Sequence, residues 1–301
     1  MVAGYETIFV HALQRVDYLR GNGKDCAASA KIVPMMTTTT RPVGDFLREW
    51  RQRRRMSQLD LALEAEISAR HLSFMETGRA MPSREMALRL AERLDMPLRE
   101  RNALLVAAGF APLFPERSLD DPLMAPARRA MELVLAGHEP FPALAVDRHW
   151  NLVAHNRAVP PFLAGVDPAL LTPPANVLRL SLHPQGLAPR IVNYWEWRNH
   201  LFERLRHQVG LSGDPTLAAL MAELASYPAP DGAQPHAASG SSDYAGVVVP
   251  LQFVTDAGTL SFISTTTVFG TPIDVTLSEL ALETFFPADA ATAQVLRSMA
   301  E

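Results

Sequence analysis

Apolar residues between 43 and 110 recur every three or four positions, which is the spacing of a helix face. The first such stripe lies in 43–50. Ser57, Ser68 and Ser83 each precede a further stripe, and serine is a favoured residue at the start of a helix. The pattern predicts five short helices joined by connections of about two to six residues.

The pattern changes after residue 110 to a mixture of helical and alternating segments. Residues 113–127 are rich in Pro and Asp and are interpreted as a linker. Alternation predicts a β-hairpin over 142–156 with its turn at Asp147–Arg148, and two more strands around Asp256–Gly258. Helices are expected at 128–137, 189–208 and 215–226, a loop at 228–242 and a last helix near Asp289. The second part is therefore predicted to be an α+β fold.

Residues 1–40 lack any sustained hydrophobic period. Met35 and Met36 stand just before the regular pattern begins, so the physiological start is Met1, Met35 or Met36. Two interpretations stay open: a mis-assigned extension, or a disordered N-terminal arm. The expected division is 1–40 for this extension, 41–112 for the helical domain, 113–127 for the linker and 128–301 for the α+β domain.

Composition is that of an ordinary globular protein and argues against several classes. The 301 residues suggest about two domains. The single cysteine, Cys26, excludes an intrachain disulfide framework and a cysteine-rich zinc site. No apolar run approaches the roughly 18 uncharged residues that cross a bilayer, and the first residues lack the apolar core of a signal peptide. We therefore expect a cytoplasmic protein with no membrane association.

Charge is distributed unevenly along the chain. The net charge of −4 by itself argues against a nucleic-acid-binding protein. Residues 41–117 nevertheless contain 14 Arg and 11 acidic residues, a net charge of +3. Residues 118–301 contain 10 Arg and 18 acidic residues, a net charge of −8. A mildly basic segment is thus joined to an acidic one.

The third predicted helix carries a mixed polar and aromatic set where a simple core helix would show a clean apolar stripe. A supporting helix over 58–65, a turn at Glu66–Ile67 and a second helix over 69–76 have the spacing of a helix-turn-helix. The supporting helix is expected to face Leu59, Ala62 and Leu63 inward. The alternative, a small helical bundle with no DNA role, stays open on this pattern alone.

The outward positions of the second helix are candidates for reading double-stranded DNA. Arg can pair with guanine through two hydrogen bonds, and Ala or Phe can touch a thymine methyl group. Residues at either end of the unit are placed to meet phosphates, aided at the first helix by its N-terminal dipole. The candidate DNA contacts are Gln58, Ser68, Ala69, Arg70, His71, Ser73, Phe74 and Arg79.

The segment RQRRRMSQLDLALEAEISARHLSFMETGRAMPS resembles the helix-turn-helix domain of the XRE/Cro-like regulators, over about residues 43–110. The matching positions are Ser57-Gln58, Leu61-Ala62, Ile67-Ser68, Leu72-Ser73, Glu76-x-Gly78-Arg79 and Pro82-Ser83. The resemblance implies that Gln58 contacts backbone and bases and that Ala69, Arg70 and Phe74 face the groove. Many members have polar residues in place of Ala69 and Phe74, so the apolar ones here point toward thymine methyls. A homodimer on a palindromic operator is expected, because one such domain reads only a short half-site.

No catalytic or metal-binding constellation is found in the sequence. Six scattered histidines have no pair at metal-ligand spacing beside a third ligand; they are His138, His149, His155, His183, His200 and His207. There is no GxSxG, no GxGxxG after a strand and no phosphate-binding P-loop. We therefore expect no enzyme, no metal site and no required cofactor.

The second half resembles the MmyB-like effector domain that follows this type of helix-turn-helix in bacterial regulators. The most specific element is D-R-x-W-x-L-x-x-x-N from Asp147 to Asn156, and further similarity lies in 176–184, 191–206, 214–224 and 258–289. The resemblance implies a PAS-like sheet with helices around a pocket for a fatty acid or similar apolar effector. The chain departs from the family at 228–250, where a loop rich in Gly, Ser and Pro replaces aromatic sequence. This departure affects the shape of the pocket and hence its ligand.

An effector pocket needs apolar walls with a few polar anchors. The candidate walls are Trp150, Tyr194, Trp195, Phe253, Phe262 and Phe269, each of which has the alternative of an ordinary core residue. Arg190 or Asn193 could meet a carboxylate. Asn156 is either a ligand contact or a turn or cap residue.

Three functions follow from these patterns. The first is a transcription regulator whose operator binding responds to a small apolar effector. The second is a DNA-binding regulator whose second domain only mediates dimerisation or protein interaction. The third is an enzyme with an accessory helix-turn-helix, for which no residue nominates a reaction. The first is the function we expect.

Overall fold

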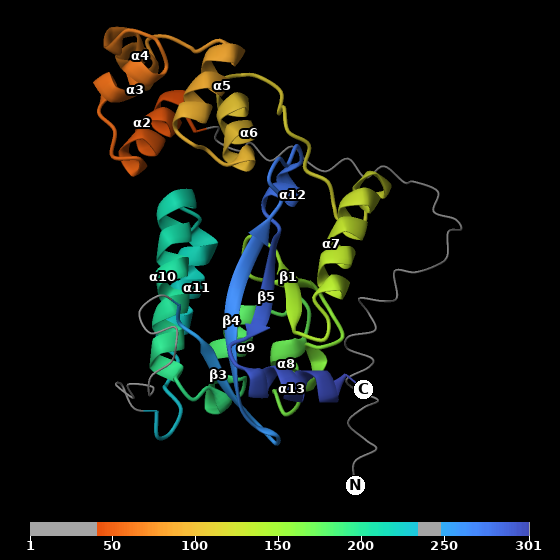
Figure 1. Ribbon diagram of the computed structural model, residues 1–301. Helices are drawn as coiled ribbons and strands as arrows, with labels where there is room; N and C mark the ends of the chain where they lie inside the picture. The colour runs from red at the N-terminus through yellow and green to blue at the C-terminus, as the bar shows by residue number, and fades with distance from the viewer. Residues whose placement is uncertain (1–40, 234–247, 301) are drawn as a thin grey trace.

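The computed structural model describes residues 41–233 and 248–300, which form a helical region followed by an α+β region (Figure 1). The helical region contains α2 (Val43–Arg53), α3 (Gln58–Glu64), α4 (Ala69–Glu76), α5 (Arg84–Arg93) and α6 (Leu98–Ala107). The α+β region contains the helices α7 (Ala125–Gly137), α8 (Pro168–Leu171), α9 (Val177–Leu182), α10 (Tyr194–Ser212), α11 (Pro215–Ala225), α12 (Val275–Ser278) and α13 (Ala290–Met299). Its strands are β1 (Ala143–Val146), β2 (Leu152–His155), β3 (Leu251–Thr255), β4 (Gly258–Val268) and β5 (Ala281–Pro287). Short 3₁₀ helices lie at η1 (Pro122–Met124), η2 (Pro160–Leu163) and η3 (Ala188–Arg190). The predicted fold class, five helices followed by an α+β domain, is confirmed; the predictions for residues 1–40 and for most of the 228–242 loop fall outside the described residues.

Serine caps start three helices of the helical region where the sequence predicts them. The Ser57 hydroxyl accepts from the Asp60 amide at 3.1 Å, and the Asp60 carboxylate accepts from the Ser57 amide at 2.8 Å. This reciprocal pair satisfies two amides that have no partner inside the helix. Ser68 and Ser83 cap α4 and α5 by accepting from the amide three residues later. These local bonds explain why such short helices begin at defined residues.

The predicted inward face of α3 is wrong at two positions. Leu59 and Leu63 are 58% and 68% exposed, whereas Leu61 and Ala62 are buried. The helix has only seven residues, and apolar side chains lie on more than one of its faces: Leu59 with Leu63 on one, and Leu61 and Ala62 on another. Which stripe faces inward is decided by the position of α4 and α5 and not by spacing within α3.

Helices α2 and α4 approach closely at Gly44. A Cβ atom at this position would lie 2.5 Å from the backbone oxygen of Glu76, a distance that real Cβ atoms do not show. Leu47 and Trp50 of α2 are buried in the same cluster as Leu72 of α4. The close approach brings the end of α4 within reach of arginine side chains on α2.

The α+β region is built on a five-stranded antiparallel sheet in the order β2-β1-β5-β4-β3. The two predicted hairpins, β1–β2 and β3–β4, are present. The central strand β5, which joins them, was not predicted. On β5, Glu283 and Phe285 face one side of the sheet and Leu282 packs on the other. Residues 282–284 are all buried, so this part of the strand shows no alternation of buried and exposed positions by which it could be recognised.

Helices cover both faces of this sheet (Figure 1). On one face, Trp197 and Leu201 of α10 share a buried cluster with Phe253 of β3. On the other face, Met131 and Leu135 of α7 pack against β1 and β5. The first of these layers contains the cavity described below.

Helix boundaries differ from the predicted ones where a turn residue intervenes. Helix α7 begins at Ala125 and not at 128. Helix α10 begins only at Tyr194, because the preceding residues form η3, and it ends at the left-handed cap Gly213, where φ is 64°. Within 41–233 and 248–300, no helix is long and apolar enough to cross a bilayer.

Candidate functional site

The exposed side of α4 carries an aromatic ring between two cations. The guanidinium carbons of Arg70 and Arg79 lie 5.3 Å and 5.8 Å from the centre of the Phe74 ring. Both arginines are exposed and Phe74 is half-buried. Stacking on the ring restrains the arginines without neutralising them. They therefore keep their hydrogen-bond donors available at the surface.

The remaining DNA-contact candidates lie on or beside the same helix, with one exception. His71 is exposed, and Ala69 and Ser73 are half-buried. The Ser68 hydroxyl accepts from the His71 amide at 3.1 Å, so this side chain caps the helix. The exception is Gln58, which lies at the first residue of α3.

Gln58 is held by a network that the sequence did not suggest. Its amide nitrogen donates to the carboxylate of Glu76 at 2.9 Å. Arg51 donates to the same carboxylate from Nε at 2.6 Å and from Nη2 at 3.0 Å, and Glu76 is buried. Burial alone would raise the pKa of Glu76, but the hydrogen bonds from Arg51 and Gln58 outweigh it and hold this pKa below its usual value. One carboxylate therefore ties α2, α3 and α4 together.

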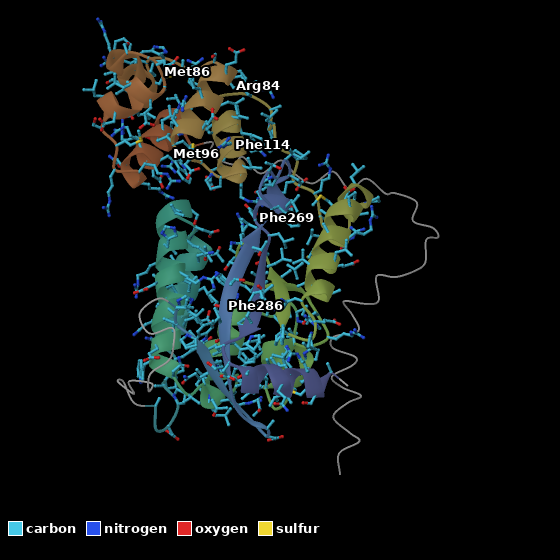
Figure 2. All side chains as sticks on the ribbon, in the orientation of Figure 1. Arg84, Met86, Met96, Phe114, Phe269 and Phe286 are labelled. Carbon is cyan, nitrogen blue, oxygen red and sulfur yellow. The ribbon has the colours of Figure 1, made fainter. Side chains whose placement is uncertain are left out.

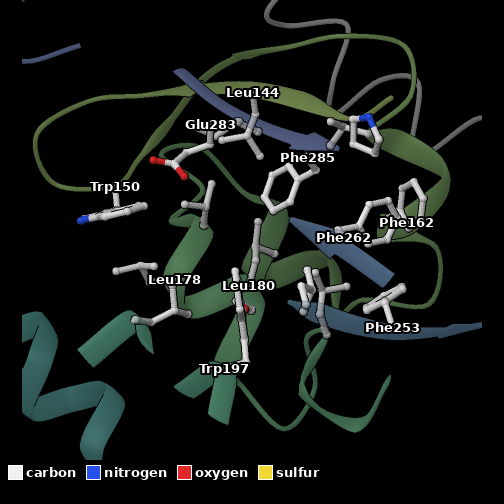
Figure 3. Close-up of a pocket in the computed structure, with 18 of the residues that line it drawn as sticks. Leu144, Trp150, Phe162, Leu178, Leu180, Trp197, Phe253, Phe262, Glu283 and Phe285 are labelled. Carbon is white, nitrogen blue, oxygen red and sulfur yellow. The ribbon is translucent and has the colours of Figure 1, made fainter. Parts of the chain in front are cut away.

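A half-enclosed cavity of about 140 Å³ lies between the sheet and the helices α9 and α10 (Figure 3). Its walls are almost wholly apolar and include Leu144, Phe162, Leu180, Trp197 and Phe285. Figure 3 shows Phe162, Phe253 and Phe262 together at one end and Trp150 with Glu283 at the other. The cavity thus has an aromatic end and a charged end.

Three of the nine predicted ligand contacts line this cavity. They are Trp150 of the β1–β2 turn, Phe253 of β3 and Phe262 of β4. The other six candidates are not among its lining residues: Asn156, Arg190, Asn193, Tyr194, Trp195 and Phe269.

The polar members of these six hold backbone in place. Buried Asn156 accepts from the Ala143 amide at 3.1 Å and donates to the Phe141 carbonyl at 2.7 Å. Asn193 accepts from the backbone amide of residue 252 at 3.0 Å and donates to the carbonyl of residue 250 at 2.7 Å. Arg190 donates to the carbonyls of residues 162 and 164, both at 3.1 Å. These bonds leave the three side chains little capacity for a ligand in the present arrangement.

The aromatic members of the six lie around the fold and not in the cavity. Tyr194 is buried at the start of α10, edge-on to Trp195. The Trp195 indole donates to the Ala233 carbonyl at 3.2 Å. Phe269 packs with the cluster on the α7 side of the sheet, and Figure 2 shows it near α12.

A buried ion pair at the charged end of the cavity was missed by the sequence reasoning. Arg204 of α10 donates to Glu283 of β5 at 2.6 Å and 3.0 Å. The one available signal was Glu283 itself, a lone acid in the apolar run LALETFF. A charge in such a run requires a partner when it is buried.

Comparison with known proteins identifies the family. Residues 127–299, more than half of the chain, match the MmyB-like transcription regulator ligand binding domain. The chain belongs to the family of MmyB-like transcription regulators. Residues 47–101 match the helix-turn-helix family. A candidate HTH-type transcriptional regulatory protein of Methanoculleus marisnigri (strain ATCC 35101 / DSM 1498 / JR1) is 38% identical over 117 residues, which are 37% of this chain and 37% of that relative.

These matches describe transcription regulators and not enzymes, in agreement with the sequence prediction. In the part of the chain that the structure describes, no group of three or more His, Cys, Asp or Glu side chains is arranged to hold a metal ion.

The MmyB-like domain contacts the helix-turn-helix domain through charged side chains. Arg99 of α6 donates to Glu279, beside α12, at 2.8 Å and 3.0 Å, and this bonding raises the pKa of Arg99. Arg148 of the β1–β2 turn lies 3.6 Å from the same carboxylate. Arg117 of the connecting segment donates to buried Asp274 at 3.0 Å. Figure 2 shows Phe114 of this segment beside α6.

A second contact joins α2 to the end of α10. The guanidinium of Arg53 packs directly on Gly213. A Cβ atom added to Gly213 would lie 1.7 Å from Arg53 Nη1. Burial raises the pKa of nearby Glu100 above its usual value, although Arg53 and other cations act in the opposite direction. The helix that lines the cavity therefore reaches the helix-turn-helix domain at its far end.

Proposed function

We propose that this MmyB-like regulator binds a DNA operator as a homodimer and that a small apolar effector in the cavity changes its operator affinity. In this proposal, residues 41–112 bind DNA and residues 128–301 bind the effector, with 113–127 between them. An aliphatic chain such as that of a fatty acid suits the apolar lining. The cavity carries the proposal, because helix α10 forms part of its wall and also contacts Arg53 of the helix-turn-helix domain.

The surface of α4 supports DNA binding. Arg70 and Arg79 are exposed on either side of Phe74 and present donors suited to guanine edges and to phosphates. Ala69 and Ser73 are small and leave room for a base edge. Two copies related by two-fold symmetry would read two half-sites of a palindrome.

Two routes connect the cavity to this surface. The first is α10, which lines the cavity through Trp197, Leu201 and Arg204 and ends at the Arg53 contact. The second is β5, which begins two residues after Glu279, the partner of Arg99. An effector can shift operator affinity only by the difference between its affinities for the two conformations. Movement of α10 or β5 on filling the cavity would supply that difference.

The test begins with native mass spectrometry of the purified full chain, followed by extraction of any bound molecule. Operator affinity is then measured on a selected DNA sequence with and without that molecule. Leu144→Trp places a large side chain in the cavity, and Leu133→Trp makes the same change at a residue that is 74% exposed on α7. We expect the effector to alter operator affinity several-fold in wild type and in the Leu133 variant, and not in the Leu144 variant.

Two results would contradict the proposal. An effector that binds the cavity without changing operator affinity would leave the second domain as a binding module that does not control DNA binding. A dimer that binds its operator but takes up no small molecule would favour the alternative, a domain for dimerisation or protein interaction.

A further inference from the structure

The two charged side chains at the charged end of the cavity form an ion pair, so this end carries no net charge. Among the lining residues, the charged side chains are Arg204 and Glu283. Arg204 donates from Nη2 to Glu283 Oε1 at 2.6 Å and from Nη1 to Oε2 at 3.0 Å. The Arg204 guanidinium also lies 4.7 Å from the centre of the Trp150 ring. This two-pronged geometry is the strongest pairing that the two groups can form.

A third residue completes the pair. The Thr266 hydroxyl accepts from Arg204 Nη2 and donates to Glu283 Oε1, both at 2.8 Å. The side chain of Glu283 is only 4% exposed, and that of Arg204 is 24% exposed. These contacts use three of the five N–H donors of Arg204, whereas Glu283 Oε2 accepts a single one of these bonds and keeps a free lone pair.

A ligand carboxylate meets no uncompensated cation among the residues that line this cavity, because the charge of Arg204 is already matched by Glu283. A ligand carboxylate that displaced Glu283 from Arg204 would leave Glu283 buried without a partner. If Glu283 stayed in place and the ligand accepted from the remaining N–H groups of Arg204, two carboxylates would share one cation in apolar surroundings. Either arrangement is costly, because a buried charge needs a partner of opposite sign. Ser181, the other polar lining residue, is a neutral hydroxyl that accepts from the Trp197 indole at 3.0 Å and cannot compensate for a charge.

We infer that the cavity selects neutral apolar molecules, best with one hydroxyl that donates to Glu283 Oε2, and discriminates against carboxylates. The inference rests on the proposed function in one respect, that the effector occupies this cavity. Its volume of about 140 Å³ is similar to the roughly 150 Å³ cavity that takes up benzene in another protein. A single ring or a short chain therefore fits the present shape better than a long acyl chain does.

The test compares an alcohol and an acid with the same chain, octan-1-ol and octanoate, by calorimetry on the full-length protein. At pH 7.5 we expect octanol to bind on the order of 30-fold or more tightly than octanoate. Glu283→Gln leaves Arg204 without its counter-charge, so this variant should gain affinity for octanoate and reverse the preference. Leu144→Trp should lose both ligands.

A pH series on wild type tests the same point without a variant. If only the protonated acid enters, the octanoate affinity falls about tenfold for each unit between pH 6.5 and 8, while the octanol affinity stays constant. The charges of Arg204 and Glu283 neutralise one another. His200 is stacked on Trp197, and burial, followed by Arg204, lowers its pKa below the usual value. The octanol series controls for any other titration in the protein.

The outcomes separate the two proposals. Octanoate that binds wild type as tightly as octanol, with an affinity independent of pH, would overturn the selectivity for neutral ligands and leave the effector cavity intact. Binding of both ligands that persists unchanged in the Leu144 variant would show that they bind elsewhere, and it would reject the cavity as the effector site together with the inference. Binding of neither ligand would reject the inference for this ligand class, while operator control by an extracted effector would still be tested separately.

Discussion

Glu76→Gln is expected to destabilise the helix-turn-helix domain far more than a surface substitution does. The carboxylate of Glu76 is buried and accepts two hydrogen bonds from Arg51 and one from Gln58. Glutamine has nearly the same shape, but its amide nitrogen must face one of these donors, and the charge of Arg51 loses its partner. Hydrogen bonds to charged groups contribute about 1.5–3 kcal/mol each. We therefore expect the free energy of unfolding of this domain to fall by about 3 kcal/mol.

The pH dependence of this effect follows from the lowered pKa of Glu76. A carboxyl group whose pKa is lower in the folded state stabilises that state fully above its unfolded pKa, here about 4.5. The contribution is lost as the pH falls through the folded pKa. The difference between wild type and the Glu76 variant should therefore be largest near neutral pH and shrink below about pH 4.5.

Hydrogen exchange of the amides in α3 and α4 of the full chain measures this difference directly. Glu92→Gln, at an exposed position of α5, is the matched control and should change the opening free energy by less than about 0.5 kcal/mol. A loss below about 1 kcal/mol for the Glu76 variant at pH 7, or a difference that persists undiminished at low pH, would refute the reasoning.

Three further predictions concern DNA reading, the fold and the domain contact. Arg70→Ala should weaken operator binding by about 1–3 kcal/mol and binding to random DNA much less; equal losses in a competition assay would argue against base reading by Arg70. Asn156→Ala should lower the free energy of unfolding of the second domain by about 1–3 kcal/mol, because it leaves buried backbone groups unpaired. A changed ligand preference without destabilisation would instead indicate that Asn156 contacts the ligand. Arg99→Ala should reduce the effector-induced change in operator affinity, measured by DNA titration with and without effector. Arg93→Ala, on the exposed side of α5, is the control and should leave this change unaltered. An unchanged effector response in the Arg99 variant would place the coupling elsewhere.

The local elements of this protein were determined by short-range features of the sequence. Ser57 and Asp289 begin helices because their side chains accept bonds from amides three residues later in the chain. The hairpin turns follow from Asp147 and from Gly258, whose φ of 109° is one that side chains rarely adopt. The two predicted domain types followed from the same local patterns together with the quoted family resemblances.

Three of the nine expected ligand contacts, Trp150, Phe253 and Phe262, could be predicted as cavity walls from their place in the hairpins. The sequence could not separate them from aromatic residues that pack elsewhere. Phe269 illustrates this, since it follows the last residue of β4 and packs with the cluster on the α7 side of the sheet. Alternation shows that two faces exist, but not which face carries the cavity.

Only the tertiary structure decided the contacts that join distant segments. Glu283 and Arg204 are 79 residues apart, and Gln58 and Glu76 are 18 apart. Strand β5 is central because it pairs with both β1 and β4, neither of which adjoins it in a simple hairpin. Caps and turns are encoded within about four residues, because their hydrogen bonds close over that distance. The site depends on which faces pack together, and that is fixed by the summed burial of the whole chain.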